Sequence, residues 1–168
     1  LICHTQESKD QLVRDFKISG SRIWVIPLGP MFHDSIKITK SEARAKLGYQ
    51  ENTPIVLFFG IIRPYKGIEH FLEAWKIVTK SCPEARLIIA GNGEREYLAQ
   101  LKAKIQDLRL NKSIVADFRF ISNEELPIFH QAVDIIVYPY KGITQSAALF
   151  TGMSFGKAIV ATSSGGFK

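Results

Sequence analysis

The sequence predicts an α/β fold, in which a doubly wound parallel sheet carries helices on both faces. Two observations lead to this prediction. Short runs of β-branched and other apolar residues alternate along the chain with segments of helical spacing. The apolar runs are nearly continuous, which is typical of parallel strands that are buried on both faces. Strands and helices in this order form right-handed crossovers, and therefore a parallel sheet.

The individual elements follow from the same patterns. The segments that read as strands are 23–27, 55–59, 86–90, 118–121, 134–138 and 158–162. The segments that read as helices are 7–16, 41–47, 68–79, 98–108, 123–132 and 144–155. Ser41 is expected to cap the helix at 41–47, and Ser122 with Glu125 forms a capping box before the helix at 123–132. Gly156 is expected to end the helix at 144–155.

Composition and charge narrow the class of protein. A chain of 168 residues, 46% hydrophobic and 23% charged, can bury the core of one domain. It contains no run of eighteen apolar residues, so no transmembrane helix is expected. Cys3 and Cys82 are far apart in the chain, which favours two unpaired thiols in a reducing cytoplasm.

The net charge of +6 comes mainly from the middle of the chain. Residues 54–113 hold ten Lys and Arg against six Asp and Glu, spread along helix faces. A solvated surface is one interpretation, and attraction to a phosphate-bearing ligand or to an acidic membrane surface is the other. No basic run is interleaved with aromatic residues, so nucleic acid is not an expected partner.

Two cations in one strand-to-helix loop form the first candidate binding site. In an open parallel sheet, ligands bind beyond the carboxyl ends of the strands. The loop Gly60–Gly67 follows such a strand and holds Arg63 and Lys66 around a proline. A planar guanidinium fork, a point charge and a helix N-terminus together suit a diphosphate. Solvated loop charges are the alternative.

A second candidate loop precedes the helix at 144–155. Gly142 would allow a close backbone approach, and Thr144 and Ser146 supply hydroxyl groups. Free amides at that helix start favour an anionic or polyhydroxyl ligand. Thr144 and Ser146 are equally interpretable as helix caps.

Two further loops carry weaker signals. Gly91-Asn92-Gly93 matches a dinucleotide-binding fingerprint only in part, with Glu96 at the place of its last glycine, and a tight turn is the alternative. The backbone of residues 121–123 could contact the edge of a flat base, or these residues could cap the following helix. The sequence has no HExxH, DxD or metal-spaced cysteine set, so no metal is expected.

Taken together in order, these loops resemble the C-terminal domain of the family 4 retaining glycosyltransferases, which have the two-domain GT-B fold. The resemblance extends over residues 23–166. Residues 1–22 are also similar to the segment that leads from one domain to the other in this family. Its motifs are Phe-Gly-Ile-Ile-Arg-Pro-Tyr-Lys-Gly at 59–67, Leu-Ile-Ile-Ala-Gly-Asn-Gly at 87–93, Phe-Ile-Ser-Asn-Glu-Glu-Leu at 120–126, Asp-Ile-Ile-Val-Tyr-Pro-Tyr at 134–140 and Phe-Gly-Lys-Ala-Ile-Val-Ala-Thr at 155–162.

The resemblance implies a domain organisation and a function. Residues 1–22 would be an interdomain approach segment, and 23–168 a Rossmann-like domain for a nucleotide-sugar donor, truncated at its C-terminal end. The sugar would pass, with retention, to a glycan or lipid-linked acceptor held by an N-terminal domain that this chain lacks. The enzyme would be cytoplasmic, with peripheral contact at the inner membrane face as a further expectation.

The resemblance also implies roles for particular residues. Arg63 and Lys66 would bind the diphosphate and stabilise its charge as it leaves, so neither a metal nor another cofactor is expected. The backbone of Ile121 would contact the base of the nucleotide. The other donor contacts would come from Gly60, Gly142, Thr144, Gln145, Ser146 and Thr151.

This chain departs from the family's pattern at two places. Ile143 and Thr151 stand where many members have a pair of glutamates, and Ile61 stands where an arginine is usual. Thr151 could still donate a hydrogen bond to a ribose. The departures keep two other functions open: a catalytically silent nucleotide-sugar binding module, and a flavodoxin-like or receiver-like regulatory domain.

Overall fold

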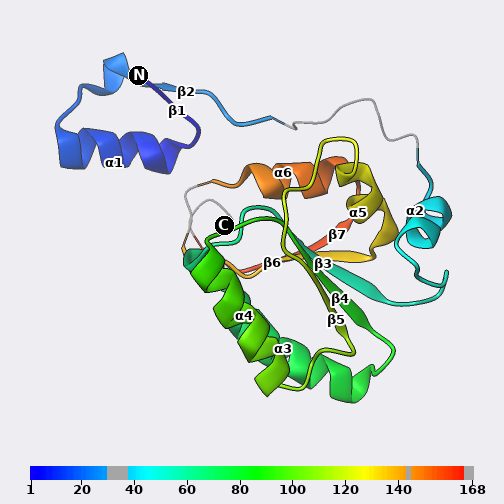
Figure 1. Cartoon of the computed structure of the whole chain (residues 1–168). Coiled ribbons are helices and arrows are strands. Elements are labelled where there is room, and N and C mark those ends of the chain that lie inside the picture. The colour runs from blue at the N-terminus through cyan, green and yellow to red at the C-terminus, as the bar shows by residue number, and fades with distance from the viewer. Residues whose placement is uncertain (30–37, 143–144, 165–168) are drawn as a thin grey trace.

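The computed structural model describes residues 1–29, 38–142 and 145–164 (Figure 1). Its centre is a parallel sheet with the strand order β5-β4-β3-β6-β7. The strands are β3 Ile55–Phe59, β4 Arg86–Ala90, β5 Ile114–Asp117, β6 Ile135–Tyr138 and β7 Ala158–Ala161. The predicted class, a doubly wound α/β fold with a parallel sheet, is confirmed.

Helices cover the sheet on both faces because the direction of winding reverses at β3. The chain passes from β3 outward to β4 and β5, and then returns to the other side of β3 to form β6 and β7. Right-handed crossovers therefore place helices on opposite faces of the two halves. Figure 1 shows α3 Ile68–Ser81 and α4 Arg95–Asp107 on one face, and α5 Leu126–Ala132 and α6 Ala147–Ser154 on the other.

The core lies between the sheet and these helices. The residues at helical spacing in the segment 68–79 form an apolar stripe, of which Ile68, Phe71, Leu72 and Trp75 are buried in α3. Val78, which continues this spacing, is 39% exposed. The Nε1 of Trp75 donates a hydrogen bond to the hydroxyl of Ser113, 3.1 Å away, so its polar end is satisfied inside the core. Beside α3, an apolar groove of about 590 Å³ runs along the face of β6 and β7.

The predicted strand at 118–121 is wrong, because the strand lies four residues earlier. β5 spans Ile114–Asp117 and pairs with β4. The chain then bends, and Arg119 pairs with Asp117 and Glu125 across the bend. The aromatic residues at 118 and 120 imitate a strand in sequence, but the pairing available along β4 ends opposite Asp117.

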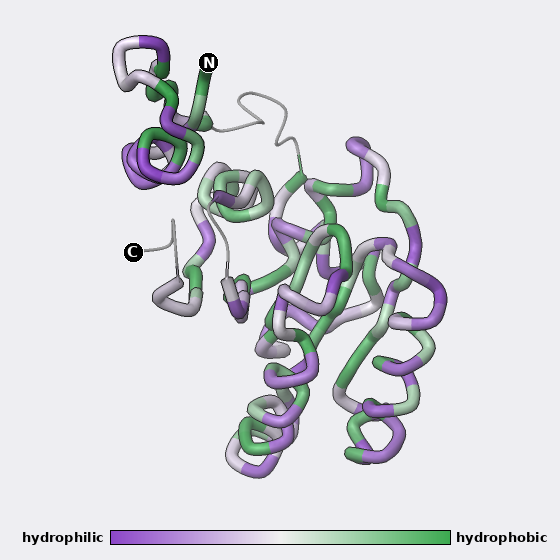
Figure 2. The backbone as a smooth tube through the Cα atoms, turned by 90° about the vertical axis from the view of Figure 1, so that its left-hand side faces the viewer, coloured by the Kyte–Doolittle hydropathy of each residue, from purple (hydrophilic) through white to green (hydrophobic). Residues whose placement is uncertain are grey.

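The predicted strand at 23–27 is also different in the structure. β2 spans only Trp24–Val25 and does not join the main sheet. It pairs in parallel with β1 Ile2–Cys3, and α1 Gln6–Phe16 and a short 3₁₀ turn at Gly20–Arg22 connect the two strands. Figure 2 shows this unit set apart from the main sheet.

Several helix starts differ from the sequence prediction: α4 begins at Arg95 instead of residue 98, and α6 begins at Ala147 instead of residue 144. Ser41 is not a cap: α2 spans Lys40–Lys46, and Thr39 caps it in a capping box with Glu42. The helix begins one residue earlier because Thr39 satisfies the amide of Glu42 while the Glu42 carboxylate accepts from the amide of Thr39. The reciprocal Ser122–Glu125 bonds are present, at 3.3 Å each, although α5 itself begins at residue 126.

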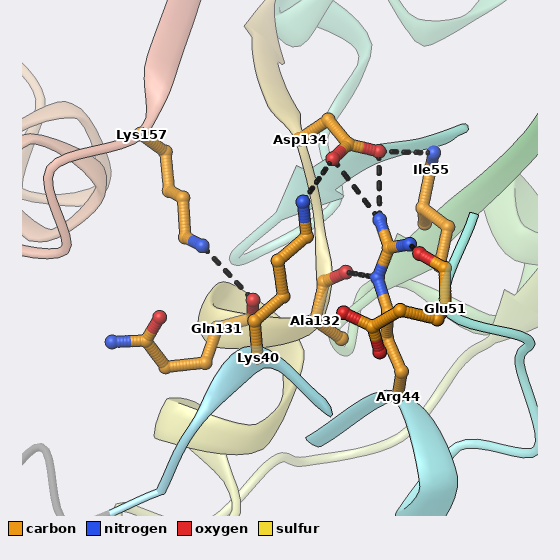
Figure 3. A network of polar contacts seen from close by, with 8 residues as sticks. All are labelled: Lys40, Arg44, Glu51, Ile55, Gln131, Ala132, Asp134 and Lys157. Carbon is orange, nitrogen blue, oxygen red and sulfur yellow. Dashed lines mark hydrogen bonds and ion pairs between the residues drawn. The ribbon is translucent and has the colours of Figure 1, made fainter. Parts of the chain in front are cut away.

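A buried ion pair holds α2 to the amino ends of β3 and β6 (Figure 3). The guanidinium of Arg44 is 2% exposed and donates to both carboxylate oxygens of Asp134, at 2.9 and 3.0 Å. Arg44 also donates to the carbonyl oxygens of Ala132 and Glu51. Asp134 accepts further bonds from the Ile55 amide at 2.8 Å and from the Lys40 ammonium at 2.6 Å. The network fixes the sheet at the end opposite to the candidate site.

Two simpler predictions concern the cysteines and membrane spans. Cys3 and Cys82 are free thiols, as the sequence predicted. Within the described ranges, no helix has the length and apolar character needed to cross a bilayer.

Candidate functional site

The loops that follow β3, β4 and β6 meet at the carboxyl end of the sheet. The amide of Ile62, in the loop after β3, donates to the carbonyl of Asn92 after β4 at 2.6 Å. The amide of Lys141, after β6, donates to the carbonyl of Tyr65 at 2.8 Å. The strand order reverses between β4 and β6, and ligands of open α/β sheets bind at such a reversal.

Glycines allow these loops to approach one another closely. Gly91 has φ +141°, and a Cβ at this position would lie 2.1 Å from the carbonyl oxygen of Gly60. Gly67 has φ +68°, and its Cβ would lie 2.1 Å from the carbonyl oxygen of Pro139. Residues 91–93 thus form a tight turn, which was one of the two interpretations of this segment. Glycine is required at position 91 because the turn packs against the loop that carries Arg63 and Lys66.

We expect Gly91→Ala to destabilise the fold by at least about 2 kcal/mol, because the side chain meets backbone and the φ is unfavourable. Gly142→Ala is the matched control, since a Cβ at Gly142 meets no described atom within 4 Å. Thermal melting of both variants tests the difference. Equal melting temperatures would contradict the close approach of the loops.

Lys66 is buried, which differs from the solvated loop charge that its sequence position allowed. Only 6% of the residue is exposed. Its Nζ lies 5.1 Å from the ring centroid of Tyr140 and 5.9 Å from that of Phe58. The short 3₁₀ turn Pro64–Lys66 brings the side chain back over the end of β3. Among the described residues, no carboxylate and no hydrogen-bond acceptor is paired with this ammonium.

The burial of Lys66 changes its protonation equilibrium. Desolvation is the main cause, and the positive charge of Arg63 is the second; together they lower the pKa of Lys66 to about 8. A buried cation without a partner is costly for the fold. A negative charge placed beside it would offset that cost.

Gly60 lies where Lys66 meets the start of α6. A Cβ built on Gly60 would be 3.4 Å from the Nζ of Lys66 and 3.6 Å from the Cβ of Ala148, in the first turn of α6. Ser146 caps this helix, and its hydroxyl accepts from the amide of Leu149 at 3.3 Å. The buried ammonium and the positive end of the helix therefore favour an anion at the same place.

Arg63 is exposed at the rim of this site. It lines a hollow of about 270 Å³ with residues of the loop after β4, Asn92 and Gly93 among them. Its charge is close enough to lower the pKa of Lys66. The two predicted cations therefore interact electrostatically, one buried and one at the surface.

We expect Arg63→Ala to leave the free energy of unfolding within about 0.5 kcal/mol, because the side chain is exposed. If Arg63 binds a phosphate, its loss should weaken the binding of a nucleoside diphosphate by roughly 1.5–3 kcal/mol. Arg63→Lys should recover only part of this, since a point charge does not replace a bidentate fork. Melting and calorimetric titration with UDP check the two effects, and unchanged affinity in Arg63→Ala would contradict the role.

Ile121 and Gly60 line one small cavity of about 140 Å³. Ile61 and Phe120 also line it, and the Phe120 side chain is 72% exposed. An aromatic ring and aliphatic surfaces at the mouth of a small apolar cavity suit a flat base. The motifs in the sequence did not point to Phe120. The available signal was a large aromatic residue in a loop, where solvation favours polar residues.

The loop before α6 holds the remaining predicted donor contacts. The Nε2 of Gln145 donates to the backbone carbonyl of His4 at 3.3 Å, in the unit formed by β1, α1 and β2. Its Oε1 is buried and has no partner among the described atoms. Ser146 takes the capping role that was its alternative interpretation, while Ile143 and Thr144 lie outside the described residues.

Thr151 is buried in α6, and its hydroxyl donates to the carbonyl oxygen of Ala147 at 3.0 Å. This placement favours packing inside the helix over a hydrogen bond to a ribose. We therefore expect Thr151→Val to melt normally and to bind UDP like the unchanged chain. Thr151→Glu should lose stability by about 2–4 kcal/mol, because it buries a charge. A tighter affinity for UDP in Thr151→Glu would instead support the ribose contact.

The parallel sheet of order β5-β4-β3-β6-β7, with loops that meet where the strand order reverses, defines an α/β domain of the doubly wound class. Comparison with known proteins gives the family. Residues 39–168 match the family described as Glycosyl transferases group 1, and the chain belongs to it.

Three proteins illustrate the similarity of this chain to known glycosyltransferases and their domains. Mannosylfructose-phosphate synthase of Agrobacterium fabrum is 27% identical over 165 residues, which are 90% of this chain and 36% of that enzyme. The structure of HepE from Anabaena, in complex with UDP and glucose, has a TM-score of 0.82 at 22% identity and covers 99% of this chain and 45% of its own. The C-terminal domain of LpcC from Francisella tularensis has a TM-score of 0.64 at 22% identity, covering 82% of this chain and 70% of its own. The chain thus spans less than half the length of the synthase and of HepE.

Proposed function

We propose that this chain is the donor-binding part of a glycosyltransferase, and that it binds a nucleoside diphosphate sugar at the carboxyl ends of β3 and β6. The observation that carries the proposal is the buried side chain of Lys66, whose ammonium has no anionic partner among the described residues. A diphosphate between Lys66, Arg63 and the start of α6 would supply the missing negative charge. The UDP bound to HepE, a protein of the same fold, agrees with this ligand class.

The proposed reaction is the transfer of a hexose, with retention, to a glycan or lipid-linked acceptor by the longer polypeptide. Lys66 and Arg63 would stabilise the diphosphate as the bond to the sugar breaks and negative charge grows on the leaving group. These two cations provide the charge that a metal ion would otherwise supply, so we propose a metal-free reaction. The same proposal places the enzyme in the cytoplasm, beside the inner face of the membrane if the acceptor is lipid-linked.

A catalytically silent binding module remains the second candidate. Thr151 is buried and carries no charge where many members of the family have a glutamate. Turnover by the longer polypeptide, measured with UDP-sugars and GDP-sugars, separates the two candidates, because a silent module would bind the donor without releasing the diphosphate.

An NMR titration of the 168-residue chain tests donor binding directly. We expect UDP or GDP to bind weakly, with a Kd on the order of 0.1–1 mM, since part of the cleft is absent. Amide shifts should gather at 60–67, 120–121 and 145–149. Uridine is the matched control, and it should shift only residues around the Phe120 cavity. Shifts confined to residues 91–96, or none at millimolar ligand, would contradict the site.

A further inference from the structure

Tyr140, in the loop after β6, is buried where several loops of the candidate site meet. The residue is 1% exposed. Its neighbours come from three other segments of the chain: Lys66 in the loop before α3, Ser146 at the start of α6, and Thr162 directly after β7. A single side chain therefore connects the buried cation with the helix that begins beside it.

The ring of Tyr140 is the closer of the two aromatic rings that the described residues place beside the Lys66 ammonium. The Nζ of Lys66 lies 5.1 Å from the centroid of Tyr140 and 5.9 Å from that of Phe58. A cation within about 6 Å of a ring centroid, over the face of the ring, is attracted by the negative π surface, and more strongly when the pair is out of water. Both side chains are buried, so Tyr140 offsets part of the cost of burying this cation.

The orientation of this ring is fixed from several sides. The rings of Tyr65 and Tyr138 lie at 76° and 81° to it, with centroids 6.0 and 5.8 Å away. Nearly perpendicular aromatic pairs are a favoured arrangement. The hydroxyl of Thr162 also donates to the backbone carbonyl oxygen of Tyr140 at 2.5 Å. The ring therefore presents a constant face to the ammonium.

The hydroxyl of Tyr140 reaches toward α6. Its oxygen lies 3.5 Å from the hydroxyl oxygen of Ser146, which caps that helix. This distance is at the long limit for a hydrogen bond, so we assign the main contribution to the ring. Burial raises the pKa of the Tyr140 hydroxyl to about 12, and the side chain is therefore neutral near physiological pH.

We propose that Tyr140 is a positioning residue for donor binding, whose ring holds the Lys66 ammonium in its charged form beside the first turn of α6. A Cβ on Gly60 would lie within 4 Å of both the ammonium and Ala148 in that turn. The other charged groups of the loops around Lys66 are Arg63 and Lys141, which repel the ammonium, so the attraction comes from the ring. This proposal rests on the proposed function, because it takes a phosphate as the ligand of Lys66.

Fluorinated phenylalanines in place of Tyr140 test the contact, because fluorine removes electron density from the ring face and changes the ring size little. Lysine labelled with ¹³C reports the pKa of Lys66 in the 168-residue chain, and its resonance is assigned by its loss in Lys66→Met. Tyr140→Phe should keep this pKa near 8. Trifluorophenylalanine should lower it by about one unit, with monofluorophenylalanine in between. Equal pKa values across the series would overturn the proposal.

Removal of the ring separates positioning from packing. Tyr140→Leu should lower both the melting temperature and the pKa of Lys66, the latter by about one unit or more. Phe71→Leu is the matched control, because it removes a buried ring from α3. It should lower the melting temperature while the pKa of Lys66 stays near 8. A raised pKa in Tyr140→Leu, or the same decrease in Phe71→Leu, would overturn the proposal.

Titration with UDP across pH distinguishes a failure of this inference from a failure of the proposed function. With trifluorophenylalanine at position 140, the pH above which UDP affinity falls should move down by about one unit, together with the pKa of Lys66. A decline that begins at the same pH as in the unchanged chain would overturn the positioning role. If Lys66→Met binds UDP as well as the unchanged chain does, the proposed function fails, whereas the pKa series, measured without ligand, still decides the contact between ring and ammonium.

Discussion

Lys66→Met is expected to stabilise the fold at neutral pH and to remove most of the affinity for a nucleoside diphosphate. The folded state holds the charged ammonium in a largely dry place, which lowers its pKa to about 8 from 10.5. Both the folded and the unfolded chain carry the proton below pH 8, so the full cost of burial is present there. Methionine fills a similar volume without a charge, and removing the cost should raise the free energy of unfolding by up to about 3 kcal/mol.

The gain in stability should depend on pH in a defined direction. Between pH 8 and 10.5 the folded chain loses the proton of Lys66 while the unfolded chain keeps it, so the stability of the unchanged chain rises relative to Lys66→Met. The difference should be largest at pH 7 and vanish near pH 10.5. Lys80→Met, on the exposed surface of α3, is the matched control and should show no such trend. A destabilised Lys66→Met at pH 7 would show that Lys66 has an anionic partner, which the described residues do not provide.

In Lys66→Met, the loss of binding free energy for UDP should be similar in size to the gain in the free energy of unfolding. A hydrogen bond to a charged group contributes roughly 1.5–3 kcal/mol, so the Kd for UDP should rise about 10- to 150-fold in Lys66→Met. A variant that is more stable and yet binds less tightly separates a functional residue from a structural one. Calorimetry of melting and of UDP binding on the same samples measures both quantities.

Asp134→Ala is expected to lower the free energy of unfolding by about 2–4 kcal/mol, because it leaves the buried guanidinium of Arg44 without its carboxylate. The estimate lies toward the lower end for buried pairs, since the side chain of Asp134 is 34% exposed and Arg44 keeps its carbonyl partners. Asp107→Ala, at an exposed position near the end of α4, is the control. Urea denaturation compares the two, and an equal effect in both would contradict the role of the network.

Asp134 should also make the fold sensitive to acid. Partial burial raises the pKa of its carboxyl, but the hydrogen bonds from Lys40 and the Ile55 amide and the charge of Arg44 lower it more. The folded carboxyl therefore has a pKa below its unfolded value. Its contribution to stability is complete above the unfolded pKa and is lost as the pH falls through the folded one. Asp134→Ala should accordingly differ least from the unchanged chain in strong acid.

The sequence was sufficient for four of the five strands of the sheet and for the position of the loop that carries Lys66, because buried parallel strands leave long apolar runs and loops leave glycine and proline. It was insufficient for β5, where the pairing partner on β4 decides the register and Phe118 and Phe120 imitate a strand. The two-stranded unit of residues 1–26 was also missed, since a pattern of apolar residues does not say with which sheet a strand pairs.

The position of Lys66 illustrates a different limit. Its place in a loop between a strand and a helix predicts an exposed charge, and the side chain is nonetheless buried. The cause is long-range: Gly67 approaches Pro139 of another loop, and Tyr140 from that loop covers the ammonium. Such contacts depend on how distant segments meet, which single-sequence patterns do not contain. The capping role of Ser146, in contrast, was one of two interpretations available from the sequence.

The pH dependence of UDP affinity tests the central claim most directly, because it asks whether the buried ammonium of Lys66 meets a phosphate. The phosphates of UDP are fully ionised above about pH 7, so their own titration does not interfere. If a phosphate pairs with Lys66, binding takes up a proton, and the affinity should stay constant from pH 7 to 8 and fall up to about tenfold per pH unit above 8. Lys66→Met should show a flat profile over the same range. A flat profile in the unchanged chain, or the same decline in Lys66→Met, would contradict the claim that Lys66 holds the donor.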